Sequence, residues 1–161
     1  MPAFTSFTGS FNAGRRAGAY TWYEAFGTTV AISTTQYVGP IKIYAESSTY
    51  DVPSYQNAKI LVNDVSIVNT ALRGHTLAVL TPRGSTVSIT NYDTYGNSNS
   101  ATTMANDLNA VTAGNIVVIV VYDASSLNAT ARSAINNGYG STNNNTWTLS
   151  RRSHIFIGTK D

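Results

Sequence analysis

Two parts of the sequence carry side chains that suit the binding of a polar ligand. Asp123 follows directly after the apolar run of residues 116–122, and the ends of such buried strands commonly open onto a ligand site. Arg151 comes just before the last apolar segment, and Trp147 lies four residues earlier. A carboxylate and a guanidinium hydrogen-bond hydroxyls and amides, and an aromatic ring covers the apolar face of a sugar. The three side chains together suit a carbohydrate. The alternatives are that Asp123 starts or caps the helix that follows, that Arg151 and Arg152 are a basic pair on the surface, or that Arg151 forms an ion pair with Asp123 without a ligand.

Signatures of catalysis are weak. The chain has two histidines, His75 and His154, and no cysteine, which excludes a cysteine nucleophile, disulfides and thiolate metal sites. It lacks a nucleophile elbow, a phosphate-binding loop and a dinucleotide fingerprint. Asp93 and Asp123, each at a strand end, form one weak candidate acid pair for glycoside hydrolysis. We therefore expect no enzyme activity, no catalytic residue, no metal and no cofactor, and we interpret both histidines as surface or hydrogen-bonded strand residues.

The composition excludes several other classes of protein. Charged residues make up 11% of the 161 residues, whereas Ser, Thr and Asn number 17, 22 and 16. A net charge of +2 is too small for nucleic-acid binding by phosphate neutralisation. The longest apolar run is far shorter than the roughly 20 residues that span a bilayer. The first residues lack the charge order of a signal peptide, so we expect synthesis in a cytoplasm and no membrane insertion.

The first 40 residues differ from the rest. They hold 8 of the 17 aromatic residues but only three charges, and Gly39 and Pro40 mark their end. We predict an extended arm with one strand at residues 28–38. Its rings must be buried, either on its own domain or in a partner. If the rings are buried in a partner, the residues that anchor or oligomerise the chain are Phe4, Phe7, Phe11, Arg15, Arg16, Tyr20, Trp22 and Tyr23.

Residues 41–161 are predicted to form one α+β domain. Apolar and β-branched runs predict strands at 41–45, 58–62, 65–68, 76–80, 85–91, 115–122, 147–149 and 153–157. Met104, Leu108 and Val111 share one face of a helix that follows the loop 97–100 and ends at Gly114. A second helix is predicted from a cap at Ser125 or Ser126 to residue 137, where Gly138 stops it.

The order of these motifs resembles the interleukin-like EMT inducer (ILEI/PANDER) domain. The resemblance covers residues 41–161 and is carried by RGHTLAVL at 73–80, YDT at 92–94, GNIVVIVVYD at 114–123, Leu127, Arg132, Arg151 and FIGTK at 156–160. It implies a β-β-α fold, in which two sheets carry two packed helices, here preceded by the arm. Animal cytokine-like members are secreted and disulfide-bonded, so the absence of cysteine sets this chain apart from them.

The resemblance also implies a ligand. Such a domain forms the stem of a glycosyltransferase of O-mannosyl glycans, where it binds a GlcNAc-type sugar, and it occurs in virion proteins of tailed phages. The sugar-contacting Asp and Arg of the family correspond to Asp123 and Arg151. Ser150 stands where an aromatic residue often precedes that Arg, and His154 stands where the last strand often has Trp. The candidate glycan-binding residues are therefore Asp123, Arg151, Trp147 and His154.

Residues 7–17 resemble segments that open small structural proteins of cyanophage-type viruses. We therefore expect a bacteriophage virion component, a tail fibre or similar surface protein, whose domain binds a host glycan or receptor. Other virion proteins and a homo-oligomer, with a trimer favoured, are the expected partners. One alternative is a capsid-decoration, collar or tail protein that binds no sugar. A glycan-degrading enzyme is the other.

Overall fold

The computed structural model describes residues 22–26, 41–50, 57–141 and 153–161. The elements within them are β1 (Trp22–Phe26), β2 (Ile41–Glu46), β3 (Ala58–Val62), β4 (Val65–Thr70), β5 (Gly74–Leu80), β6 (Thr86–Tyr92), α1 (Ser98–Ala110), β7 (Ile116–Tyr122), α2 (Ala129–Tyr139) and β8 (Ile155–Thr159).

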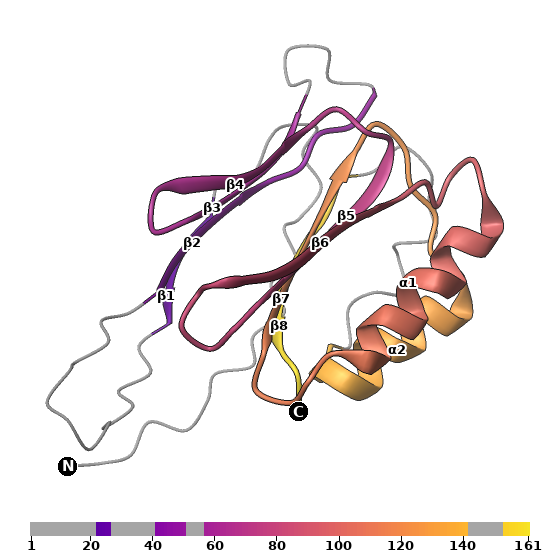
Figure 1. The fold of residues 1–161 in the computed structure, drawn as a ribbon. Helices are drawn as coiled ribbons and strands as arrows, with labels where there is room; N and C mark the ends of the chain where they lie inside the picture. The colour runs from indigo at the N-terminus through magenta and orange to yellow at the C-terminus, as the bar shows by residue number, and fades with distance from the viewer. Residues whose placement is uncertain (1–21, 27–40, 51–56, 142–152) are drawn as a thin grey trace, which may run out of the picture.

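The strands form two antiparallel sheets, and the two helices cover one of them. The first sheet has the order β1-β2-β3-β4 and the second β6-β5-β7-β8. Figure 1 shows α1 and α2 side by side on the face of the second sheet that points away from the first. The predicted α+β arrangement of two sheets and two helices is confirmed.

Strand β7 lies at the centre of this arrangement. Its first six residues are buried, and alternate side chains point to opposite faces of a strand. Val117 and Ile119 belong to the core beneath the helices, whereas Val118 and Val120 belong to the core between the sheets. A strand that is buried on both faces has no polar side, which explains the unbroken apolar run.

Helix α1 begins earlier than predicted, because residues 98–100, which were expected to be loop, form its first turn. The side chain of Asn97 caps it by accepting a hydrogen bond from the Asn99 N–H at 3.0 Å. Its buried face contains Met104 and Leu108, both on the predicted stripe. The helix ends at Ala110, before the predicted stop at Gly114.

The predicted bounds of α2 are wrong at both ends. Its cap is Asn128, whose side chain accepts a hydrogen bond from the Ala131 N–H at 2.9 Å, so Ser125 and Ser126 lie before the helix. Gly138 lies inside the helix, which ends when Gly140 adopts a left-handed conformation and donates its N–H to the carbonyl of residue 136. Several candidate caps and two nearby glycines made these ends ambiguous in the sequence.

Strand β1 falls within the segment that we predicted as an arm. It pairs with β2 from Trp22 opposite Ala45 to Phe26 opposite Ile41, so the first sheet extends across the predicted boundary at residue 40. The strands expected at 28–38 and 147–149 lie outside the described residues. No helix in the described part of the chain has the length and apolarity that crossing a membrane requires.

Alanine substitutions at two glycines test the fold, because one would cause backbone strain alone and the other would cause a steric clash as well. Gly74 (φ +102°) and Gly140 (φ +65°) both have positive φ, but a Cβ on Gly74 would overlap the Tyr92 carbonyl oxygen, whereas one on Gly140 would meet nothing within 4 Å. We expect Gly140→Ala to lower the free energy of unfolding by about 1–2 kcal/mol, the left-handed penalty alone. Gly74→Ala should cost clearly more or prevent folding. Urea titrations of both variants measure this, and equal losses would contradict the packing of β5 against β6.

Candidate functional site

Asp123 lies where the chain leaves β7, in a backbone conformation that side chains rarely adopt. Its φ is +65°, a value that Asn and Asp tolerate better than other residues with a Cβ. The backbone holds it from both sides, because its N–H donates to the Ser48 carbonyl at 3.1 Å and its own carbonyl accepts from the Tyr50 N–H at 3.0 Å. The alternative that Asp123 starts the following helix is wrong, since α2 begins at Ala129.

The segment that holds Asp123 links the two sheets. Residues 47–50 follow β2 of the first sheet and run beside the end of β7 in the second. Besides the backbone bonds, the Ser47 hydroxyl accepts from the Val121 N–H at 2.8 Å and donates to the His154 carbonyl at 2.7 Å. This buried hydroxyl therefore joins β7 to the residue before β8 at the point where their direct pairing ends.

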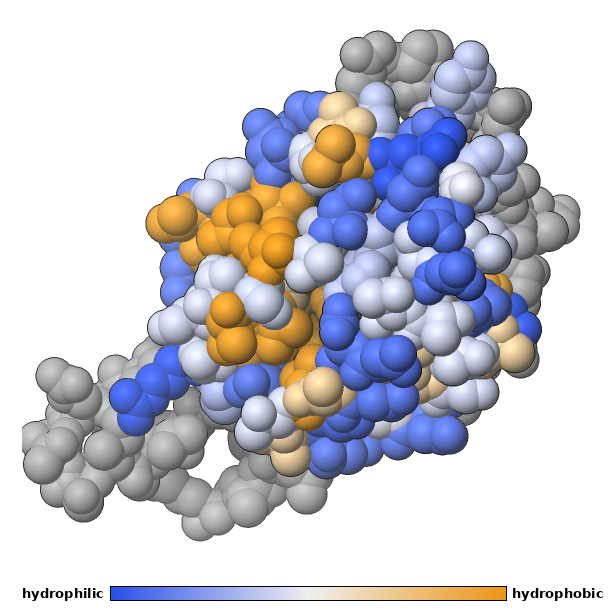
Figure 2. Space-filling view, turned by 45° about the vertical axis from the view of Figure 1, so that its right-hand side comes forward, coloured by the Kyte–Doolittle hydropathy of each residue, from blue (hydrophilic) through white to orange (hydrophobic). Residues whose placement is uncertain are grey.

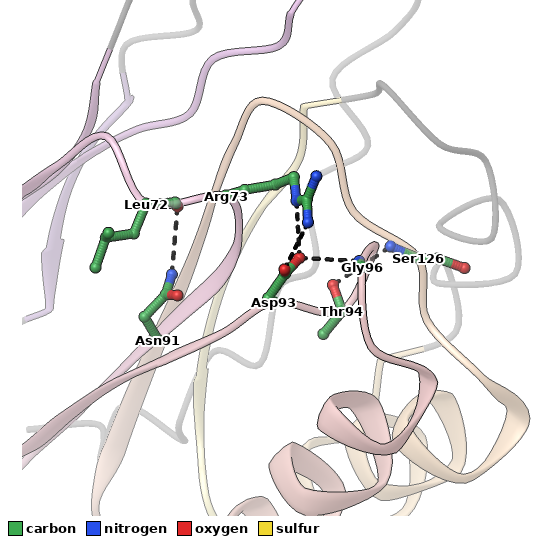
Figure 3. Close-up of polar contacts among 7 residues, drawn as sticks. All are labelled: Leu72, Arg73, Asn91, Asp93, Thr94, Gly96 and Ser126. Carbon is green, nitrogen blue, oxygen red and sulfur yellow. Dashed lines mark hydrogen bonds and ion pairs between the residues drawn. The ribbon is translucent and has the colours of Figure 1, made fainter.

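Arg73 and Asp93 form a two-pronged ion pair beside Asp123. The Arg73 Nε and Nη2 groups donate to the two Asp93 carboxylate oxygens at 2.9 and 2.7 Å (Figure 3). Asp93 also accepts the Gly96 N–H at 2.9 Å. These bonds, first of all the one from Arg73, lower the pKa of Asp93. A glycosidase acid needs a raised pKa, so Asp93 is poorly suited to the role of proton donor.

Sequence reasoning did not assign Arg73 to the site, although it belongs to one of the motifs. Strands β5 and β7 are antiparallel neighbours with Gly74 opposite Tyr122, and this register carries Arg73 to the side of Asp123. Hydrogen bonding to Asp93 is the main cause of the raised pKa of Arg73, and the negative charge of Asp123 adds to it. The position of Arg73 next to Asp123 therefore depends on the pairing of β5 with β7. Residue spacing along a single strand does not show this pairing.

Two exposed tyrosines flank these charges. Tyr95 is 46% exposed, and the Arg73 guanidinium carbon lies 5.4 Å from its ring centroid. Tyr50 is 65% exposed and is held next to Asp123 by its backbone N–H. We call the five residues Tyr50, Arg73, Asp93, Tyr95 and Asp123 the rim cluster. They combine carboxylates, a guanidinium and aromatic rings on one accessible edge, which suits a ligand that is rich in hydroxyl groups.

His154 contacts another imidazole inside the protein. Its Nε2 lies 2.8 Å from Nε2 of His75, and Nδ1 of His75 lies 2.7 Å from the Thr94 hydroxyl. That hydroxyl also accepts the Ser126 N–H at 3.4 Å (Figure 3). His75 is completely buried, whereas His154 keeps partial exposure. The pair thus ties β5 to the residue before β8, and the interpretation of His75 as a hydrogen-bonded strand residue agrees with these contacts.

Several predicted site residues fall outside the part of the chain that the structure describes. Arg151 and Trp147 are among them, as are the proposed anchoring residues up to Tyr20. Trp22 and Tyr23 lie in β1, where they are opposite Ala45 and Tyr44 of β2. Within the described ranges, no group of three or more His, Asp or Glu side chains is arranged to hold a metal ion.

The histidine pair predicts that acid destabilises the domain. Desolvation lowers the pKa of both rings below the ordinary value, and the neighbouring His154 lowers that of His75 further. Below about pH 6.5 the unfolded histidines bind protons that the folded ones do not. Stability is therefore present above that pH and falls as the pH drops from 7 to 5, by about 2 kcal/mol for each histidine.

Urea unfolding at pH 7, 6 and 5 measures this loss, with His154→Gln as the comparison because its amide can still hydrogen-bond His75. The variant should lose about half as much stability over the same range, since one of the two titrating rings is gone. Most carboxylates titrate below this window, so equal losses in the two proteins would show that other groups cause the acid sensitivity.

A comparison with known proteins identifies the family. The model of the interleukin-like EMT inducer family matches residues 73–161, which include β5 to β8, both helices and every rim-cluster residue except Tyr50. No curated protein matches the sequence. The match covers more than half of the chain and confirms the resemblance found in the sequence motifs. The chain belongs to the interleukin-like EMT inducer family.

Proposed function

We propose that this protein is a surface component of a bacteriophage virion, such as a tail fibre, whose ILEI domain binds a host glycan through the rim cluster. One observation carries the proposal of sugar binding. Asp123 and the Arg73–Asp93 pair lie on an accessible edge between two exposed tyrosines. The ILEI-like domains that this sequence resembles include the sugar-binding stem of a glycosyltransferase. Asp123 corresponds to the sugar-contacting residue of that stem.

In this proposal each side chain has a distinct role. Asp123 accepts hydrogen bonds from sugar hydroxyls. The ion pair with Asp93 uses Nε and Nη2 of Arg73, so Nη1 is the group that donates to a ligand oxygen. Tyr95 covers an apolar sugar face, and Arg73 holds the ring in place through its cation–π contact. Arg151 adds a second guanidinium in this proposal.

The virion context has different support. A chain with few charges and many Ser, Thr and Asn residues makes its surface from hydroxyls and amides, which suits a particle protein. The resemblance of residues 7–17 to phage structural proteins adds to this. In the proposal, residues 1–40 anchor the chain to other virion proteins, except for β1, which pairs with β2 of the domain, and residues 41–161 face the host.

A structural role without sugar binding is the second candidate. It is favoured by the exposed apolar residues Val65, Val87 and Ile89, which are 64%, 55% and 42% exposed. Such residues suit a surface that packs against a neighbouring protein. A glycan-degrading enzyme has less support, because the ion pair lowers the pKa of Asp93.

Binding of the intact protein to an array of glycans and host polysaccharides tests the proposal, with Asp123→Asn as the main variant. Asparagine keeps the left-handed backbone at this position and removes only the charge, so folding is preserved. We expect binding to fall at least about tenfold, which corresponds to the loss of one charge-assisted hydrogen bond. Arg151→Ala should weaken binding as well.

The matched control is Asp64→Asn, because it removes one carboxylate from an exposed turn that is held by Lys42 and lies apart from the rim cluster. It should bind like the wild type. Binding that is equal in all variants would place the sugar elsewhere. If the wild type bound no glycan at high concentration, the structural role would be favoured.

A further inference from the structure

Strand β6 is an edge strand with an unusually open surface. It pairs with β5 on one side, and no other described strand pairs with its outer edge. Five consecutive residues, from Thr86 to Thr90, are exposed. The backbone N–H and C=O groups along such an edge are available to another strand.

The strand lacks the residues that usually protect an edge. Its sequence, TVSITNY, contains no charged residue and no proline, although lysine and proline are common protections. The register shift between Val79 and Leu80 of β5 lies opposite residues 86–88, so the pairing is regular from Ser88 to Tyr92. This regular part presents an uncharged, β-branched edge to solvent.

Apolar side chains accompany the open backbone. Ile89 is opposite Ala78, which lies in the core between the sheets, so Ile89 points to the side of the first sheet. Val87, at the register shift between β5 and β6, is also exposed, and β4, the edge strand of the first sheet, exposes Val65. Figure 2 shows hydrophobic side chains gathered on one side of the molecule. The open edge is therefore bordered by apolar surface.

We propose that β6 pairs with β6 of a second copy of this chain, antiparallel and about a two-fold axis at Ile89. This register places Ile89 opposite Ile89 of the second copy and Ser88 opposite Thr90 of the second copy. Val87 then lies opposite Asn91 of the second copy. The second sheets of the two copies join into one continuous sheet across the axis.

A second copy fits this edge because the edge is complementary to itself. Ile89 meets Ile89 of the second copy on one face, the hydroxyls of Ser88 and Thr90 meet on the other, and the strand brings no charged residues together. A two-fold contact needs such self-complementarity, since the same surface serves both partners. The contact is centred on Ile89, four residues before the rim cluster residue Asp93, and the proposal does not require sugar binding.

Charge reversal across the axis tests the contact. Ile89→Lys places two ammonium groups opposite each other, and Ile89→Glu does the same with two carboxylates. By light scattering after size exclusion at about 50 µM, a concentration at which a micromolar dimer is formed, the wild type should be a dimer and each variant alone a monomer. A mixture of the two variants should form a heterodimer again, because opposite charges then face each other.

The control is Asn106→Lys, an exposed position on α1 that adds the same charge on the helix layer. It should remain a dimer. Ile89→Cys gives an independent measurement, because the wild type has no cysteine. This variant should cross-link into a disulfide dimer under mild oxidation, since residues directly opposite have Cβ atoms about 4.5–5.5 Å apart, whereas Asn106→Cys should not.

Three results would overturn the proposal. The wild type could be a monomer, it could be a trimer, or it could stay a dimer in Ile89→Lys. A monomeric wild type, together with an Ile89→Cys variant that does not cross-link, would mean that a second copy does not cover this edge. A trimer would point to the first 40 residues as the contact. Circular dichroism of each variant confirms that a monomer is folded and not a denatured chain.

Discussion

The burial of β7 on both faces is the constraint on which the rest of the structure depends. One strand of Val and Ile side chains serves two cores, so the helices and the first sheet must pack on opposite sides of it. Because β5 and β8 are its neighbours in the sheet, the ends of all three strands are brought to one edge. The rim cluster and the histidine pair lie at that edge, and both follow from the position of one apolar strand.

Local pattern predicted much of the fold, and long-range pairing explains most of what it missed. Apolar alternation predicted β2, a short apolar run predicted β3 and a long one predicted β7, because the order of side chains along one strand reflects which of its faces are buried. The start of α2 was missed because Ser125, Ser126 and Asn128 all suit a cap, and tertiary packing decides among them. Strand β1 was missed because its aromatic residues indicated an arm, whereas its place beside β2 depends on a partner distant in sequence.

The residues of the candidate site also fall into two groups, those that local pattern predicts and those that depend on long-range pairing. Asp123 was predictable, since it directly follows the strand that the sequence marks most clearly. Arg73 depends on the register of β5 against β7, and the contact of His75 with His154 joins residues 79 positions apart. A sequence shows which residues are able to form such pairs, and only the fold shows which ones meet. The partial exposure of His154 beside a fully buried His75 is a property of the packed edge, and neither residue's neighbours in sequence encode it.

The segment after β2 has a mechanical consequence. Residues 48–50 run alongside residues 121–123 and are joined to them by three backbone hydrogen bonds. A pull between the N-terminal strand β1 and a molecule held at Asp123 would pass through β2 into this short parallel contact. The load would then be shared among the three bonds in shear, because it acts along the strands, and they would not be opened one after another. A domain connected in this way resists separation of its two sheets when tension is applied along that line.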